Sequence, residues 1–198
     1  MKLVCLDLEG VLVPEIWIDF ADRTGIEALR ATTRDIADYD ELMTMRLAEL
    51  DRHGLGLPDI EAVISEMSPL PGAEAFLEGL RAQYQVVILS DTFREFARPL
   101  MRQLGWPTLF CHGLQIEASG QISNYHLRLP DHKREAVNAF RQLNFEVVAA
   151  GDSYNDTNML GAAHTGILFN APDNVLAQFP QFDHCDSYEA LAQTIEQA

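Results

Sequence analysis

The chain has 198 residues, of which 47% are hydrophobic, and a formal net charge of −16 at pH 7. This length and composition predict a globular protein with one core and a small accessory domain, and they exclude a disordered chain. The acidic charge excludes broad contact with nucleic acid or anionic membranes, because both bind through basic patches, so an anionic substrate would need a local positive site.

The cysteines and the N-terminus predict a cytoplasmic protein. Cys5, Cys111 and Cys185 are far apart, and their number and spacing argue against a disulfide framework or a zinc knuckle. Asp7 and Glu9 interrupt the first apolar run before the apolar region of a signal peptide would be complete. No stretch approaches the roughly 20 apolar residues that span a bilayer.

Short apolar runs predict the strands of a parallel sheet. They lie at 3–6, 86–89, 147–150 and 166–169, with a weaker run at 108–111. Amphipathic helical patterns separate the later runs. This alternation predicts an α/β fold with a three-layer, Rossmann-like parallel sheet that is covered on both faces. Sites in such folds lie at the carboxyl ends of the strands.

Two insertions interrupt this pattern. About 75 residues separate the first two strands, far more than one crossover helix needs, and helical patterns fill them at 15–22, 40–52 and 58–66. We predict an α/β core and an inserted helical cap that covers the first strand end, with boundaries at 1–13 and 72–198 for the core and 14–71 for the cap. Alternating residues around a Gly-containing turn predict a small β-hairpin at 113–127.

The first strand delivers two carboxylates, Asp7 and Glu9, into a turn at Gly10. Residues i and i+2 of a strand point the same way, so both side chains would face one site. Like charges this close persist if a cation or a shared proton compensates them. An acidic loop after a strand is the plain alternative, and this pair alone does not decide between them.

Three more motifs follow at predicted strand ends or helix starts. Ser90-Asp91-Thr92 ends the second strand, and Thr92 with Glu95 has the spacing of a capping box for the next helix. A hydroxyl at a helix N-terminus can bind phosphate. Lys133 falls in the first turn of a helix, where a cation is unfavourable unless it pairs with anions. Gly151-Asp152-Ser153-Tyr154-Asn155-Asp156 adds two carboxylates at the same sheet edge.

In this order, the four motifs resemble the haloacid dehalogenase superfamily of aspartate-nucleophile phosphotransferases, and the helical insert resembles that superfamily's first-type cap. The runs Leu89-Ser90-Asp91-Thr92 and Gly151 to Asp156 are most similar to phosphoserine phosphatases. The run from Cys5 to Glu15 is most similar to the ThrH-type bifunctional phosphoserine phosphatase/homoserine phosphotransferase family.

The resemblance implies a Mg²⁺-dependent enzyme that hydrolyses O-phospho-L-serine to L-serine and phosphate through an aspartyl phosphate. Phosphoryl transfer to homoserine, and a place in serine and threonine biosynthesis, follow from the same likeness. It implies small-molecule substrates without nucleic-acid or membrane partners, and it leaves a homodimer open. A phosphatase of this superfamily for another small phosphorylated metabolite is the alternative.

The resemblance also implies roles for the acids. Asp7 would be the nucleophile and a metal ligand, and Glu9 would protonate the leaving alkoxide and then deprotonate the acceptor. The backbone carbonyl of Glu9 and Asp152 would complete the metal ligands, with Asp156 orienting the metal shell. A divalent cation is expected because a carboxylate that attacks a phosphate dianion meets strong repulsion.

The substrate would be held at two ends. By the same likeness, Ser90, Asp91, Lys133 and Asn155 surround the substrate, and Ser90 and Lys133 bind the phosphoryl oxygens. Arg46 lies i+4 from Leu42 and i+3 from Met43, on the apolar side of its helix. It would bind the carboxylate of an amino-acid substrate, and Glu15 would meet the ammonium group.

Glu9 departs from the phosphoserine phosphatase pattern, which commonly has Asp at this position. Our hypothesis is that the longer side chain activates water less well, so that a bound alcohol competes for the phosphoryl group.

Three other classes of protein fit the sequence less well. The long insert argues against a signalling receiver domain, and the filled motif positions argue against a catalytically silent protein. The missing Gly-x-Gly-x-x-Gly argues against a nicotinamide-binding protein. The six histidines have no ligand spacing and are assigned no role.

Overall fold

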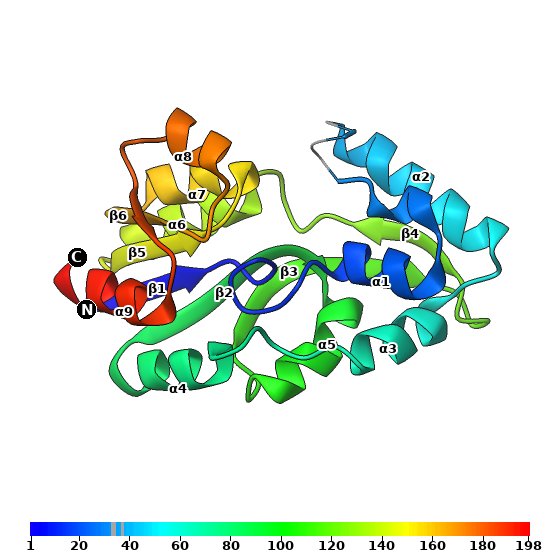
Figure 1. The fold of residues 1–198 in the computed structure, drawn as a ribbon, viewed down its shortest axis with the longest axis horizontal. Helices are drawn as coiled ribbons and strands as arrows, with labels where there is room; N and C mark the ends of the chain where they lie inside the picture. The colour runs from blue at the N-terminus through cyan, green and yellow to red at the C-terminus, as the bar shows by residue number, and fades with distance from the viewer. Residues whose placement is uncertain (33–34, 37) are drawn as a thin grey trace.

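The computed structural model describes residues 1–32, 35–36 and 38–198. Its centre is a seven-stranded sheet in the order β4-β3-β2-β1-β5-β6-β7 (Figure 1). Neighbouring strands are parallel, except that β4 is antiparallel to β3. The strands are β1 (Lys2–Leu6), β2 (Gln85–Phe93), β3 (Thr108–Ile116), β4 (Ile122–His126), β5 (Glu146–Gly151), β6 (Thr165–Phe169) and β7 (Asp183–Cys185).

Alternate residues of β1 enter two different apolar cores. Val4 and Leu6 belong to one core, and Leu3 and Cys5 belong to the other. The first core includes residues of α4 (Ala73–Gln83), α5 (Arg94–Gln103) and α9 (Tyr188–Gln197). The second includes residues of α6 (His132–Gln142), α7 (Thr157–Ala162) and α8 (Asp173–Gln178). Helices therefore cover both faces of the sheet, which confirms the predicted α/β fold in three layers.

Helices also fill the insertion between β1 and β2. They are α1 (Ile16–Thr24), a 3-10 helix at Glu27–Arg30, α2 (Tyr39–Arg52) and α3 (Leu57–Ser65). The three predicted helices are confirmed, whereas the 3-10 helix was not predicted. In Figure 1, α1, α2 and α3 lie at the end of the molecule opposite the two chain termini. None of the described helices is both long enough and apolar enough to cross a membrane. The domain boundaries at 14 and 71 remain a prediction.

The predicted hairpin is formed by β3 and β4, and its tip lies against the start of α3. The Leu57 amide donates to the Gly120 carbonyl at 2.8 Å. A side chain at Gly56 would come within 2.6 Å of the same carbonyl oxygen, so this contact requires glycine. The edge strand β7 was not predicted, because its three residues include two polar ones and carry no apolar run.

The capping box predicted from Thr92 and Glu95 is wrong. β2 continues to Phe93, and α5 begins at Arg94 without a side-chain cap. The Thr92 amide donates to Ser90 Oγ, and the Glu95 carboxylate accepts from the Leu114 amide at 3.1 Å. The strand conformation of Thr92 and a competing donor from β3 therefore remove both halves of the box.

Candidate active site

A cavity of about 370 Å³ opens beyond the carboxyl ends of β1, β2 and β5. β1 lies between β2 and β5 in the sheet, so the loops that follow these strands meet at one place. The volume suits a small metabolite. The cavity wall includes nine of the ten residues predicted for the site: Asp7, Glu9, Glu15, Arg46, Ser90, Asp91, Lys133, Asp152 and Asn155. The tenth, Asp156, is fully buried.

Lys133 joins three carboxylates at the bottom of this cavity. Its Nζ lies 2.9 Å from Asp7, 2.8 Å from Asp156 and 3.0 Å from Asp91. Lys133 therefore has the anionic partners that a lysine in a first helical turn requires. Burial alone would lower the pKa of Lys133, but Asp156, Asp7 and Asp91 raise it well above its usual value. The ammonium group is therefore a fixed positive charge in an acidic chain.

The environment of Asp7 calls for positive charge. Burial, followed by the nearby Asp156, raises its pKa well above the usual value, while Lys133 opposes the shift. Oxygens of Asp7, Asp152 and Asp156 lie within 4.8 Å of one another. Burial, followed by Asp156, also raises the pKa of Asp152 to about 7. Carboxylates that crowd in this way suit a hard divalent cation, which takes oxygen ligands.

Two glycines make room for these acids. Gly10 has a φ of +77°, and a side chain there would lie 2.4 Å from the Asp152 carboxylate. A side chain at Gly151 would lie 2.4 Å from Asp156. Asp156 Oδ2 accepts from the amides of Asp152 and Ser153 at 3.0 and 3.1 Å. Asp156 therefore fixes the turn that presents Asp152 to the cavity.

Glu9 turns its carboxylate toward the helical insert. Its Oε2 accepts from the Ile16 amide at 2.8 Å, at the start of α1. Burial, followed by the nearby Glu15, raises the pKa of Glu9 to about 8. A carboxyl group with this pKa is largely protonated at neutral pH and can both donate and accept a proton.

Arg46 places a second positive charge in the cavity wall. It is buried, as its helical position predicted, and its guanidinium lies 4.5 Å from the centre of the Trp17 ring. One Nη donates to the Ala31 carbonyl at 2.9 Å, but the buried Nε has no hydrogen-bond partner among the described residues. Burial lowers the pKa of Arg46 to about 10, so the group stays charged. Glu15 is exposed and lines the same cavity.

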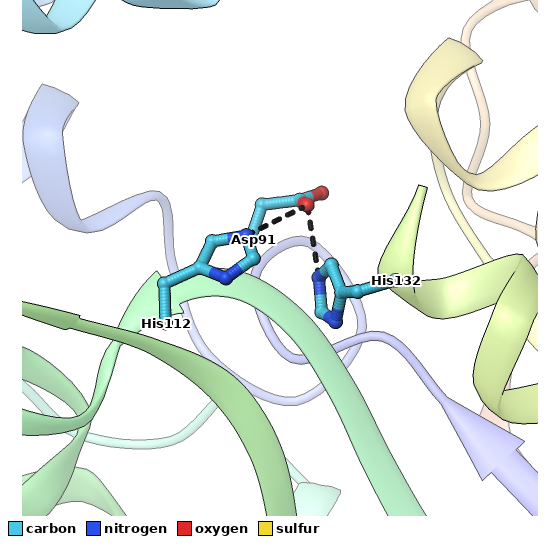
Figure 2. A group of neighbouring side chains, drawn as sticks. All are labelled: Asp91, His112 and His132. Carbon is cyan, nitrogen blue, oxygen red and sulfur yellow. Dashed lines mark hydrogen bonds and ion pairs between the residues drawn. The ribbon is translucent and has the colours of Figure 1, made fainter. Parts of the chain in front are cut away.

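Asp91 is the most heavily bonded acid of the cavity wall. Its Oδ2 accepts from Asn155 Nδ2 at 3.0 Å and forms an ion pair with Lys133 Nζ. Its Oδ1 faces the Nε2 atoms of His132 and His112, at 3.1 and 3.7 Å (Figure 2). Sequence reasoning gave these histidines no role, because they stand 20 residues apart, in β3 and α6, with no ligand spacing.

Comparisons with known proteins agree with this geometry. The haloacid dehalogenase-like hydrolase family model matches residues 1–164. The chain is 61% identical to the phosphoserine phosphatase ThrH of Pseudomonas aeruginosa over 191 residues, which cover 96% of this chain and 93% of the relative. It is 60% identical to a phosphoserine phosphatase of Pseudomonas syringae pv. tomato, with 96% and 81% covered.

Solved structures share the fold. A phosphoserine phosphatase structure described as a phospho-aspartyl intermediate analogue superposes with a TM-score of 0.76 at 21% identity, over 93% of this chain and 92% of the other. A phosphoserine phosphatase in apo form gives 0.74 at 22% identity, with the same coverage. The family match over most of the chain and the identity to full-length relatives show that the chain belongs to the haloacid dehalogenase-like hydrolases, within their phosphoserine phosphatases.

Proposed function

We propose that this chain is a Mg²⁺-dependent phosphoserine phosphatase that forms an aspartyl phosphate on Asp7 and also transfers the phosphoryl group to homoserine. One observation carries the proposal: Asp7 directly follows β1 and lies beside Lys133, in a cavity that also contains the buried Arg46. A nucleophile, a cation for the phosphoryl group and a cation for a carboxylate are thus combined in a cavity of amino-acid size. The names of the relatives in Pseudomonas support the substrate.

Asp7 is suited to attack phosphorus because Lys133 binds its Oδ1 and leaves Oδ2 for the new bond. The P–O bond to the serine oxygen breaks as the bond to Asp7 forms, which gives the aspartyl phosphate. Asp7, Asp152 and the backbone carbonyl of Glu9, with Asp156 behind them, would hold a Mg²⁺ ion, which when bound neutralises the repulsion between carboxylate and phosphate dianion.

Ser90 and Lys133 would bind the phosphoryl oxygens. Ser90 Oγ accepts from the Thr92 amide at 3.2 Å, so its hydroxyl hydrogen is left to donate elsewhere. Asn155 Nδ2 adds a third donor on the same wall. Fixed donors aimed at a group that gains negative charge lower the barrier without reorganisation.

Glu9 would supply the proton for the leaving serine oxygen. With a pKa of about 8, it carries this proton at neutral pH. After donating, the carboxylate can take a proton from water or from the homoserine hydroxyl that attacks the aspartyl phosphate. The Ile16 amide occupies Oε2, so Oε1 is the atom that exchanges the proton.

The helical insert would recognise the amino-acid end. Among the described residues, Arg46 Nε has no hydrogen-bond partner, so the guanidinium can form a two-point contact with a carboxylate, while Glu15 can bind the ammonium group. We therefore propose residues 14–71 as a cap that selects the substrate. A homodimer and a cytoplasmic location remain predictions of this proposal.

The proposal is tested by measuring phosphate release from a panel of phosphomonoesters with Mg²⁺, with and without homoserine. We expect release from phosphoserine and formation of phosphohomoserine. If the enzyme prefers another phosphomonoester, the proposed substrate is wrong but the proposed mechanism still stands. Asp7→Asn should abolish both activities while the circular dichroism spectrum is unchanged, and full turnover by this variant would overturn the mechanism.

A further inference from the structure

Asp91 binds two separate sets of donors through its two oxygens. Oδ2 accepts from Asn155 Nδ2 at 3.0 Å and forms an ion pair with Lys133 Nζ, also at 3.0 Å. Oδ1 faces the Nε2 atoms of His132 and His112, which approach it from α6 and β3 (Figure 2). The Asp91 side chain is 38% exposed, whereas both histidine side chains are 3% exposed. One carboxylate thus connects a buried histidine pair to the cavity.

Arg128 fixes the hydrogen positions of both histidines. Its backbone amide donates to His112 Nδ1 at 3.1 Å, and its guanidinium lies 3.2 Å from His132 Nδ1. Amide and guanidinium N–H groups can only donate, so both Nδ1 atoms must be acceptors without a hydrogen. We therefore assign the hydrogen of each neutral ring to Nε2, so that His132 donates to Asp91 Oδ1 at 3.1 Å and the N–H of His112 faces the same oxygen at 3.7 Å. Burial also lowers the pKa of His132, which disfavours its charged form.

This assignment argues against a metal ion in the cluster. Two imidazoles and a carboxylate are a common ligand set for transition metals. A ligating nitrogen must offer a lone pair, but here both Nε2 atoms carry hydrogens and both Nδ1 atoms face Arg128. The histidine pair is therefore built to hold the Asp91 carboxylate.

Asp91 also uses a donor that a phosphoryl group would need. Lys133 Nζ donates hydrogen bonds to Asp7 and Asp156 and forms an ion pair with Asp91. A phosphoryl oxygen that binds Lys133 competes with these three carboxylates for its positive charge. Asp7 is the proposed nucleophile, and Asp156 is fully buried and held by two backbone amides. Asp91 is thus the replaceable partner, and its Oδ2 also engages Asn155.

We propose that Asp91 is a specificity-determining competitor at the phosphoryl subsite: its Oδ2 competes with a phosphoryl oxygen for Lys133 and Asn155, and His112 and His132 keep it there through Oδ1. The inference rests on the proposed function of Lys133 and Asn155. A dianionic phosphate monoester displaces the carboxylate more readily than a singly charged phosphodiester does. The same competition weakens the binding of inorganic phosphate, so product inhibition is low.

Asp91→Asn tests the competition, because it keeps the shape and an oxygen for the histidines but removes the charge. We expect inorganic phosphate to bind about tenfold more tightly with Mg²⁺ present, both as an inhibitor of phosphoserine hydrolysis and by calorimetry. Asp131→Asn is the matched control. It removes the same charge outside the cavity wall, and its φ of +48° suits asparagine. It should leave phosphate binding unchanged.

His112→Phe and His132→Phe test the positioning role. Each removes an N–H group that faces Asp91 Oδ1 but keeps a ring, so the carboxylate is freer to leave Lys133 and phosphate should bind more tightly. In the Asp91→Asn background they should have no further effect. A merely structural role predicts weaker binding in both backgrounds. Independently of folding of the variants, ¹H–¹⁵N NMR of the wild type should show both imidazoles neutral with the hydrogen on Nε2.

The outcomes separate this inference from the proposed function. An active phosphoserine phosphatase whose Asp91→Asn variant binds phosphate equally or less tightly overturns the inference alone. Imidazoles with the hydrogen on Nδ1, or Zn²⁺ bound through them, also overturn it. A chain that neither hydrolyses phosphoserine nor binds inorganic phosphate overturns the proposed function.

Discussion

Replacing Lys133 by methionine should destabilise the protein strongly. The substitution keeps an unbranched side chain, one heavy atom shorter, but removes the charge that lies within 3.0 Å of Asp7, Asp91 and Asp156. Removing one partner of a buried ion pair costs about 3–5 kcal/mol, because the remaining charge is buried without compensation. For a chain of this size, that loss lowers the thermal midpoint by roughly 6–20 °C. Urea unfolding in the presence of a chelator measures the free energy directly.

The loss should depend on pH in a defined direction. Without Lys133, the pKa of Asp7, which burial and Asp156 already raise, rises further. A carboxyl group with a raised pKa binds its proton more tightly in the folded than in the unfolded state, so acid favours folding. The deficit of Lys133→Met is then largest at neutral pH and shrinks as the pH falls toward the ordinary aspartate value of 3.8.

A matched control lies one residue away. Arg134 is 46% exposed and pairs with Asp131 and Glu135, so Arg134→Met removes a charge from the same helix at a cost of about 0–1 kcal/mol. If Lys133→Met loses no more stability than this control at pH 7, or if its deficit is the same at pH 5, the three carboxylates do not depend on the lysine as we infer.

Three further outcomes are expected. Arg46→Lys should raise the KM for phosphoserine about tenfold with little change in kcat, because lysine lacks the planar fork, and leave the KM for phosphoethanolamine unchanged. An equal change in KM for both substrates would show that Arg46 does not recognise the substrate carboxylate. Hydrolysis of phosphoserine should fall as the pH rises through about 8, where Glu9 loses its proton, while hydrolysis of an aryl phosphate with a good leaving group should show no such fall. Glu9→Gln should remove the decrease in phosphoserine hydrolysis at alkaline pH. If the decrease remains in this variant, another group causes it. Glu9→Asp should raise the ratio of hydrolysis to phosphoryl transfer to homoserine. An unchanged or lower ratio would contradict the hypothesis that the longer Glu9 side chain favours transfer to an alcohol.

The site residues that could be predicted from the sequence are mainly those that follow the strands of the parallel sheet. Asp7, Ser90 and Asp152 each follow an apolar run, and parallel strands place their carboxyl ends at one edge. Lys133 was predicted to need anionic partners because of its place in a first helical turn. Arg46 was predicted to be buried from the apolar residues one turn before it, and it is 7% exposed.

The missed features depend on partners that are distant in the chain. Glu95 has capping-box spacing from Thr92, but its carboxylate reaches the Leu114 amide, which only the pairing of β2 with β3 brings close. His112 joins the site because it lies opposite Phe93 in that pairing. His132 is adjacent in sequence to Lys133, yet its function as a donor depends on where Arg128 lies. Local spacing contains no information on such contacts.

The position of the Glu9 side chain explains why the second acid after β1 is a glutamate while the first, Asp7, is an aspartate. Its Oε2 binds the Ile16 amide, so the proposed proton donor is hydrogen-bonded to the first turn of α1 in the helical insert. An aspartate, one methylene shorter, could not keep this bond and the same carboxyl position at once. The longer side chain therefore couples the proton-transfer group to the element that also contributes Trp17, against which Arg46 packs. Acceptor choice and recognition of the amino-acid end would then depend on one helix, which is why exchanging Glu9 for aspartate should change the acceptor ratio rather than abolish turnover.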